Sequence, residues 1–73
     1  MKIIAEISKK GYTIFFKEND TVVAEVKMLK ISGGARSDNP IIEQEKKIDE
    51  LGLSDAFESI DHACFDAMCE LNK

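Results

Sequence analysis

The first part of the chain alternates between apolar and polar residues with a period of two. Residues 2–8, 12–17 and 22–29 each show this alternation, which is typical of strands with one face buried. The pattern predicts a three-stranded antiparallel β-meander over residues 1–31, with the apolar faces of all three strands on one side.

The connections between these segments predict how the strands pair. Lys10–Gly11 predicts a two-residue turn, which would place Ile7 opposite Ile14. The next connection is expected to be an odd loop at residues 19–21. A two-residue turn there would bury charged residues of the third strand, such as Glu25, without partners.

The second half of the chain changes to apolar spacings of three and four. A flexible loop is expected at residues 32–39, and Asn39–Pro40 predicts an N-cap followed by proline at the first helical position. The short helix that follows is expected over residues 40–51, with Gly52 just past its end. A long helix is expected over residues 54–72. Its predicted buried stripe is Phe57, Ile60, Cys64, Ala67, Met68 and Leu71.

Together these elements predict an α+β fold in a single domain, residues 1–73. The long helix is expected to pack on one face of the sheet, and the short helix to lean on one end. The second sheet face stays bare and carries Ile4, Phe15 and Val23 among charged residues. Such a patch is either incidental or a contact surface, and as a contact surface it could join two copies in a homodimer.

Length and composition narrow the class of protein. The 73 residues, 44% of them hydrophobic, suffice for one small core. No apolar run approaches the ~20 residues that cross a bilayer, and residues 1–8 are too short and too charged for a signal peptide. Cys64 and Cys69 lie on different faces of the predicted long helix, which disfavours a disulfide. We therefore expect a cytoplasmic protein with no membrane partner.

The charge is divided unevenly along the chain. Residues 1–37 hold seven basic against four acidic residues, a net +3, and residues 38–73 hold three lysines against ten acidic residues, a net −7. The acidic half is either an ordinary solvated helix surface or a face for a partner protein with a basic surface. On the second interpretation the contact residues are Glu43, Asp49, Glu50, Glu58, Asp61 and Asp66.

Phe65 is a large aromatic residue among these acids. At 100° per residue it falls about 100° from the centre of the predicted buried stripe, so its ring is expected to be only partly covered. It either folds against the margin of the sheet or anchors a partner, since half-exposed aromatics beside charged residues are favoured binding positions.

Candidate chemistry is sparse. His62, Asp66 and Cys69 share one side of the long helix, but three ligands without paired cysteines do not fit zinc, and Cys69 near a helix C-terminus lacks stabilisation of its thiolate. We expect no catalytic site, no metal and no cofactor. The acidic pI of about 4.9 disfavours direct nucleic-acid binding.

Two resemblances extend this interpretation. The small size, the strands followed by a C-terminal helix and the acidic helices resemble, in general plan, the small bacteriophage proteins that block host defence, among them anti-CRISPR inhibitors. This resemblance implies a non-enzymatic inhibitor in the cytoplasm of a bacterial host, bound to a basic, nucleic-acid-processing complex. Residues 11–16 are also similar to the opening of the HicB-like antitoxin fold, which implies instead a small homodimeric or regulatory protein.

Overall fold

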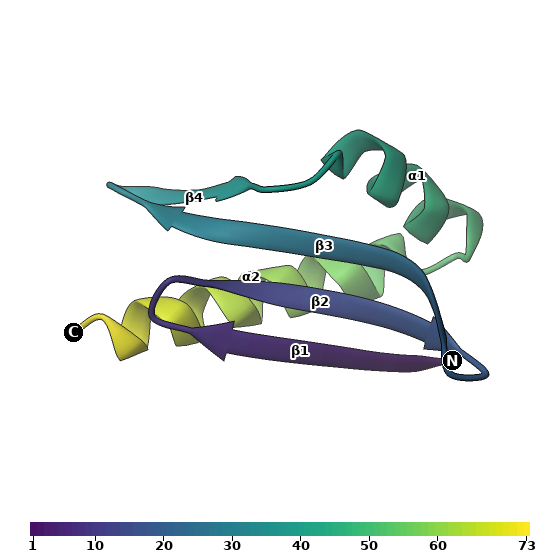
Figure 1. Cartoon of the computed structure of the whole chain (residues 1–73), viewed down its shortest axis with the longest axis horizontal. Coiled ribbons are helices and arrows are strands. Elements are labelled where there is room, and N and C mark those ends of the chain that lie inside the picture. The colour runs from purple at the N-terminus through teal and green to yellow at the C-terminus, as the bar shows by residue number, and fades with distance from the viewer.

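The computed structural model describes residues 1–73 as four strands followed by two helices. The sheet is antiparallel with strand order β1-β2-β3-β4. Helix α2 lies behind the sheet and crosses its strands obliquely, and α1 lies beside one end of β3 (Figure 1). The element bounds are β1 Lys2–Ser8, β2 Gly11–Glu18, β3 Thr21–Ile31, β4 Gly34–Ser37, α1 Ile41–Glu50 and α2 Ser54–Leu71. The α+β class is confirmed, but the sheet has four strands and not three.

The β1–β2 hairpin turns one residue earlier than predicted. Ser8 pairs with Gly11, so the turn is Lys9–Lys10, and Ile7 lies opposite Tyr12 and not opposite Ile14. The reason is the position of Gly11 within β2. A Cβ on Gly11 would lie 2.1 Å from the carbonyl oxygen of Met28 on β3, so the glycine is required where the two strands approach closely. The pairing partners shift by two residues, an even number, which leaves every side chain on its predicted face.

The β2–β3 connection is a two-residue turn, and the predicted odd loop at residues 19–21 is wrong. Asn19 and Asp20 have φ values of 50° and 67°, the positive pair that a type I′ hairpin turn needs. The register also shifts by one residue between Phe16 and Lys17, which marks a β-bulge near this turn. The bulge supplies the odd residue that the loop was expected to supply, so Ala24, Val26 and Met28 face the core as predicted, whereas Val22, before the bulge, is 47% exposed.

The segment predicted as a flexible loop contains β4, which corrects that prediction. Gly34–Ser37 pairs antiparallel with the end of β3, from Ile31 opposite Gly34 to Met28 opposite Ser37. Gly33, with φ of 82°, lies in the tight turn between the strands and has the left-handed backbone that glycine accepts. β4 was not predicted because its four residues include only one small apolar residue, which is too few to show an alternating pattern.

Beyond β4, side-chain amides continue the pairing along β3. The backbone N–H of Lys27 donates to Oδ1 of Asn39 (3.1 Å), and Nδ2 of Asn39 donates to the carbonyl of Glu25 (2.8 Å). The N–H of Glu25 donates to Oε1 of Gln44 on α1 (2.8 Å). Asn39 is therefore not the predicted N-cap, and α1 begins after Pro40 with no side-chain cap bond.

The core lies between the sheet and the two helices. Its buried members are Tyr12, Ile14, Phe16, Ala24, Val26, Ile48, Cys64 and Met68. The rings of Phe16 and Phe57 meet at 6.2 Å with a tilt of 55°, a favourable aromatic arrangement. Leu71, predicted in the buried stripe, is 45% exposed because it is the last residue of α2. Neither helix has the length and apolar character needed to span a membrane.

Candidate protein-binding site

The two helices form a groove that several acidic side chains line. This interhelix groove has a volume of about 520 Å³. The acidic lining residues are Glu45 and Asp49 from α1 and Glu58 and Asp61 from α2. The other lining residues are Lys46, Ile48, Ser54 and Phe57. Helical spacing explains the arrangement, because residues three or four apart share one face of a helix.

The short connection between α1 and α2 holds the groove together. Gly52, with φ of 73°, donates its N–H to the carbonyl of Asp49 (2.9 Å). The N–H of Leu53 donates to the carbonyl of Ile48 (3.1 Å), and Oγ of Ser54 donates to Oδ1 of Asp49 (2.9 Å). A glycine in the left-handed region after a helix is a common helix ending. The tight link keeps the carboxylates of α1 close to those of α2.

None of the groove acids forms an ion pair within the chain, although Lys46 lines the groove with them. The chain contains two ion pairs, His62 with Asp66 (3.6 Å) and Lys73 with Glu70 (2.8 Å), and both lie on the exposed surface of α2 and the C-terminus. Glu45, Asp49 and Glu58 are therefore free to bind cations from outside. Carboxylates that face a shared hollow and form no ion pairs attract a positive partner.

Asp61 has a second role within the groove. Its Oδ1 accepts a hydrogen bond from the hydroxyl of Tyr12 on β2 (2.8 Å). Burial, together with this bond and the negative charge of Asp61, raises the pKa of Tyr12 well above its ordinary value. Burial, and then the charge of Asp61, also raises the pKa of Cys64. Asp61 thus joins α2 to the sheet and also lines the groove.

The structure brings together only part of the predicted acidic face. Asp49, Glu58 and Asp61 line the groove, whereas Glu43 and Glu50 are exposed on α1 outside it. Asp66 is also exposed, beside His62 on the outer side of α2. Phe65 is half-buried and packs against the core. The interpretation of these residues as contacts stays a prediction.

Glu45 is the site residue that sequence reasoning missed. It lines the interhelix groove and also an adjoining hollow of about 330 Å³ that Met28, Arg36 and Phe57 help to line. Its spacing of four from Asp49 was the available signal, since both then lie on one face of α1. Only the position of α2 shows that this face is the concave one.

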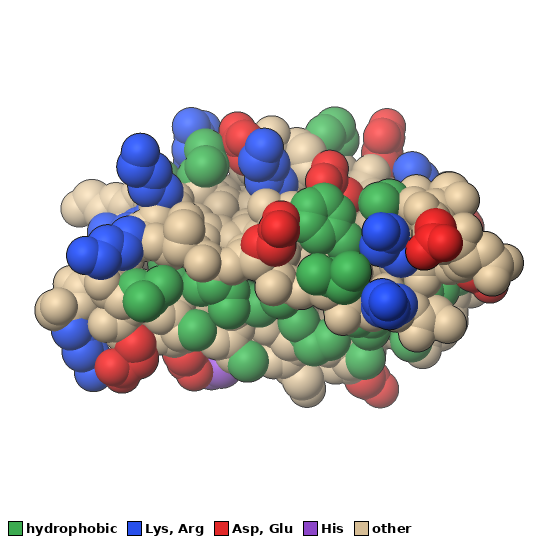
Figure 2. Space-filling view, turned by 60° about the horizontal axis from the view of Figure 1, so that its bottom comes forward, with side chains coloured by type: hydrophobic (Ala, Val, Ile, Leu, Met, Phe, Trp, Pro, Cys, Tyr) green, Lys and Arg blue, Asp and Glu red, His purple; other side chains and the backbone are tan.

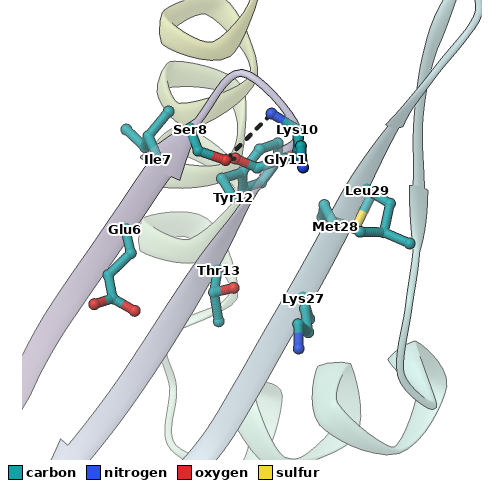
Figure 3. A pocket seen from close by; sticks show the side chains of 10 residues that line it. All are labelled: Glu6, Ile7, Ser8, Lys10, Gly11, Tyr12, Thr13, Lys27, Met28 and Leu29. Atoms are coloured by element: carbon teal, nitrogen blue, oxygen red, sulfur yellow. Dashed lines mark hydrogen bonds between the residues drawn. The ribbon is translucent and has the colours of Figure 1, made fainter.

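The second face of the sheet carries no helix (Figure 1). Ile4 and Phe15 are half-buried there, and Ile4 lies directly opposite Phe15. Val23, predicted on this face, instead packs against the core because the register shifts by one residue beside it. A shallow hollow of about 220 Å³ lies around Gly11, with Glu6, Lys10 and Lys27 among its lining side chains (Figure 3). Both signs of charge border it, so it selects neither an anion nor a cation.

The candidate metal and catalytic residues do not form a cluster. No group of three or more His, Cys, Asp and Glu side chains lies close enough together to hold a metal ion. His62 approaches only Asp66, with both side chains largely exposed. Cys69 is exposed and Cys64 is buried, and both are free thiols.

No family model, curated protein or solved structure matches the chain. The resemblances to phage inhibitors and to HicB-like antitoxins therefore stay predictions.

Proposed function

We propose that the protein is a non-enzymatic protein-binding module whose interhelix groove takes basic side chains of a partner protein. The observation that carries this proposal is the set of four carboxylates, from Glu45, Asp49, Glu58 and Asp61, around one groove with no internal cation paired to them. Bringing a cation to such a site relieves the repulsion between the carboxylates and adds charge-assisted hydrogen bonds.

Arginine suits the groove better than lysine. A guanidinium presents a planar fork of donors that binds carboxylates in pairs, and it stacks on aromatic rings. The groove offers both kinds of partner, because Phe57 lines it together with the acids. Lys46, also in its lining, repels a cation from one side and so favours an approach from the side of α2.

A basic partner surface of this kind is what a nucleic-acid-processing complex uses to hold phosphates. Occupation of that surface by an acidic protein would exclude the nucleic acid. On this basis the protein acts as an inhibitor of such a complex, in line with the phage inhibitors that it resembles in general plan. The net charge of −7 over residues 38–73 supports the proposal, since it steers encounter with a basic surface.

The test compares two variants that each remove three charges. Glu45→Gln, Asp49→Asn and Glu58→Gln together neutralise the groove and leave Asp61 bonded to Tyr12. Glu18→Gln, Asp20→Asn and Glu25→Gln together make the same charge change on the sheet. Each variant is used to capture partners from a lysate, and the affinity for each captured protein is then measured with purified components.

We expect the groove variant to bind the partner at least about tenfold more weakly than the wild type, a change of about 1.4 kcal/mol. The sheet variant should bind within about twofold of the wild type, and raising the salt to about 1 M should release the partner, because salt screens exposed charges. Equal losses in the two variants, or a complex that survives high salt unchanged, would contradict the proposal.

A further inference from the structure

The outer edge of β1 is open along its whole length. β1 pairs only with β2. The bond from the amide of Lys30 to the carbonyl of Lys10 fixes the phase of the antiparallel alternation. In that phase Ile3, Ala5 and Ile7 direct their N–H and C=O groups away from β2, and no other segment of the chain bonds to them. Unpaired strand edges of this kind are templates for another strand.

On the opposite side of the sheet, the outer backbone groups of β3 have hydrogen-bonding partners within the chain. β4 pairs with the end of β3, and Asn39 and Gln44 then bond to the backbone of Glu25 and Lys27. The outer side of β3 is therefore covered, and the free edge on that side of the sheet is β4, which has four residues against the seven of β1. The longer edge offers more outward backbone groups to a second strand, which favours pairing along β1.

The side chains along β1 are also incompletely covered. Figure 2 shows a band of hydrophobic side chains in the middle of the face where β1 comes forward, with charged side chains of both signs around it. Ile7 is 40% exposed, and Met1, directly before the strand, is 57% exposed. Helix α2 contacts β1 and β2 but leaves these residues of the margin in contact with solvent.

We propose that two copies of this chain pair antiparallel along β1, with Ile4 on the two-fold axis. The pairing places Ile3 opposite Ala5 of the second copy, and Ile7 opposite Met1 of the second copy. On the other face, Lys2 lies opposite Glu6 of the second copy, and the symmetry repeats this contact. The result is a continuous eight-stranded sheet in a two-fold dimer, the commonest symmetry of homo-oligomers.

Charge selects this register over its neighbours. A strand can shift only in steps of two if its outward backbone groups are to stay paired. One such shift brings Lys2 opposite Ser8 and Glu6 opposite Ile4, and the opposite shift brings Lys2 opposite Ile4. Only the register centred on Ile4 pairs each Lys2 with a Glu6, and opposite charges directly across strands are stabilising.

The surroundings of Lys2 within one copy of the chain also favour its contact with Glu6 of the second copy. Within the chain, Lys2 lies directly opposite Lys17, and like charges across strands are destabilising. Glu6 of the second copy would approach Lys2 from the free side and offset that repulsion. Because the interface is one short strand on each side, we expect a reversible dimer that dissociates on dilution.

The test is a charge exchange measured by sedimentation over a concentration series. Lys2→Glu places two acidic side chains across from each other in the dimer, and Glu6→Lys places two basic ones there, so each single variant should weaken dimerisation at least about tenfold. The double variant restores opposite charges and should dimerise within about threefold of the wild type. An equimolar mixture of the two single variants should form a heterodimer, because every cross-pair is then attractive. Lys30→Glu, with the same charge change on β3, should dimerise like the wild type.

A second variant tests the backbone. Ala5→Pro removes an outward N–H without touching the ladder to β2 and is tolerated at an edge strand, so it should abolish dimerisation, whereas Ala5→Val should not. A wild type that stays monomeric at the highest concentration, or single charge variants that dimerise normally, would overturn the proposal. The dimer does not depend on the proposed groove function. The groove variant, which combines Glu45→Gln, Asp49→Asn and Glu58→Gln, should therefore dimerise like the wild type.

Discussion

The hydroxyl of Tyr12 donates a hydrogen bond of 2.8 Å to Oδ1 of Asp61, across 49 positions of sequence. It is the only direct side-chain hydrogen bond between the sheet and α2. Tyr12 is 4% exposed, so its hydroxyl has little access to water if the carboxylate is removed. The pair therefore links the stability of the fold to the position of one wall of the groove.

Removing the hydroxyl of Tyr12 and removing the carboxylate of Asp61 should each destabilise the protein, but by different amounts. Tyr12→Phe removes both the donor and the need for an acceptor, and we expect a loss of about 1 kcal/mol in the free energy of unfolding. Asp61→Ala leaves the buried hydroxyl without a partner, so we expect about 2 kcal/mol. Urea denaturation measures both. Asp66→Ala, an exposed change on the same helix, should stay within about 0.5 kcal/mol of the wild type, and an equal loss there would contradict the role of the pair.

The burial of Tyr12, together with its bond to Asp61, makes stability depend on pH in the alkaline range. The pKa of Tyr12 is raised in the folded state, so the unfolded chain ionises this tyrosine first, near its ordinary pKa of about 10. Stability is therefore fully present below that pH and falls as pH rises above it. Tyr12 is the only tyrosine and the chain has no tryptophan, so ultraviolet absorbance of tyrosinate follows it alone. Ionisation near the ordinary pKa in the folded protein would contradict this account, and Tyr12→Phe should lose the tyrosinate signal and this part of the alkaline destabilisation.

The two cysteines should react at very different rates. Cys69 is exposed, whereas Cys64 is buried and its pKa is raised, which lowers the fraction of reactive thiolate. A thiol reagent should modify one cysteine rapidly in the folded protein and the other only on unfolding. Cys69→Ser should remove the fast phase and Cys64→Ser should keep it. Two fast phases in the wild type would show that α2 does not stay packed on the sheet.

The stability of the protein should depend on the side-chain oxygen of Gln44, which accepts a hydrogen bond from the backbone N–H of Glu25 on β3. Gln44→Glu keeps an oxygen to accept from the N–H of Glu25, so we expect a small change in stability. Gln44→Met keeps the length of the side chain but leaves that N–H unpaired, so we expect a loss of about 1–2 kcal/mol and faster hydrogen exchange at Glu25. Equal stabilities of the two variants would show that water replaces the amide.

The alternation of residues was sufficient to predict the buried faces of β2 and of β3 after the bulge, but Ile7 on β1 and Val22 on β3 are exposed although predicted on the buried face. Ile14 and Val26 are opposite each other in the core, as a period of two requires. The turns could not be predicted as well, because several combinations of loop length and bulge place the same strand faces toward the core. The structure uses a two-residue turn at Asn19–Asp20 with a bulge at Phe16–Lys17. Alternation indicates which faces of the strands are buried, but it does not indicate which combination of turn and bulge brings these faces to the same side of the sheet.

The candidate site was predictable only as a set of acids. Sequence spacing shows which acids share a face of one helix, but the angle between α1 and α2 decides which faces meet. That angle depends on contacts such as the bond from Ser54 to Asp49 and on Ile48 entering the core. Glu45 was missed and Glu43 was included for this reason. Likewise, nothing in the local pattern showed that Asp61 pairs with Tyr12.

The most direct measurement of the central claim is an NMR titration of the labelled protein with a short arginine-rich peptide at physiological salt. The account predicts that the backbone amides of Glu45, Asp49 and Glu58 shift most, and that neutralising these three residues abolishes the shifts. The sheet variant with Glu18, Asp20 and Glu25 neutralised should respond like the wild type. Shifts that are spread over all acidic residues, or that centre on the sheet, would contradict a binding site in the interhelix groove.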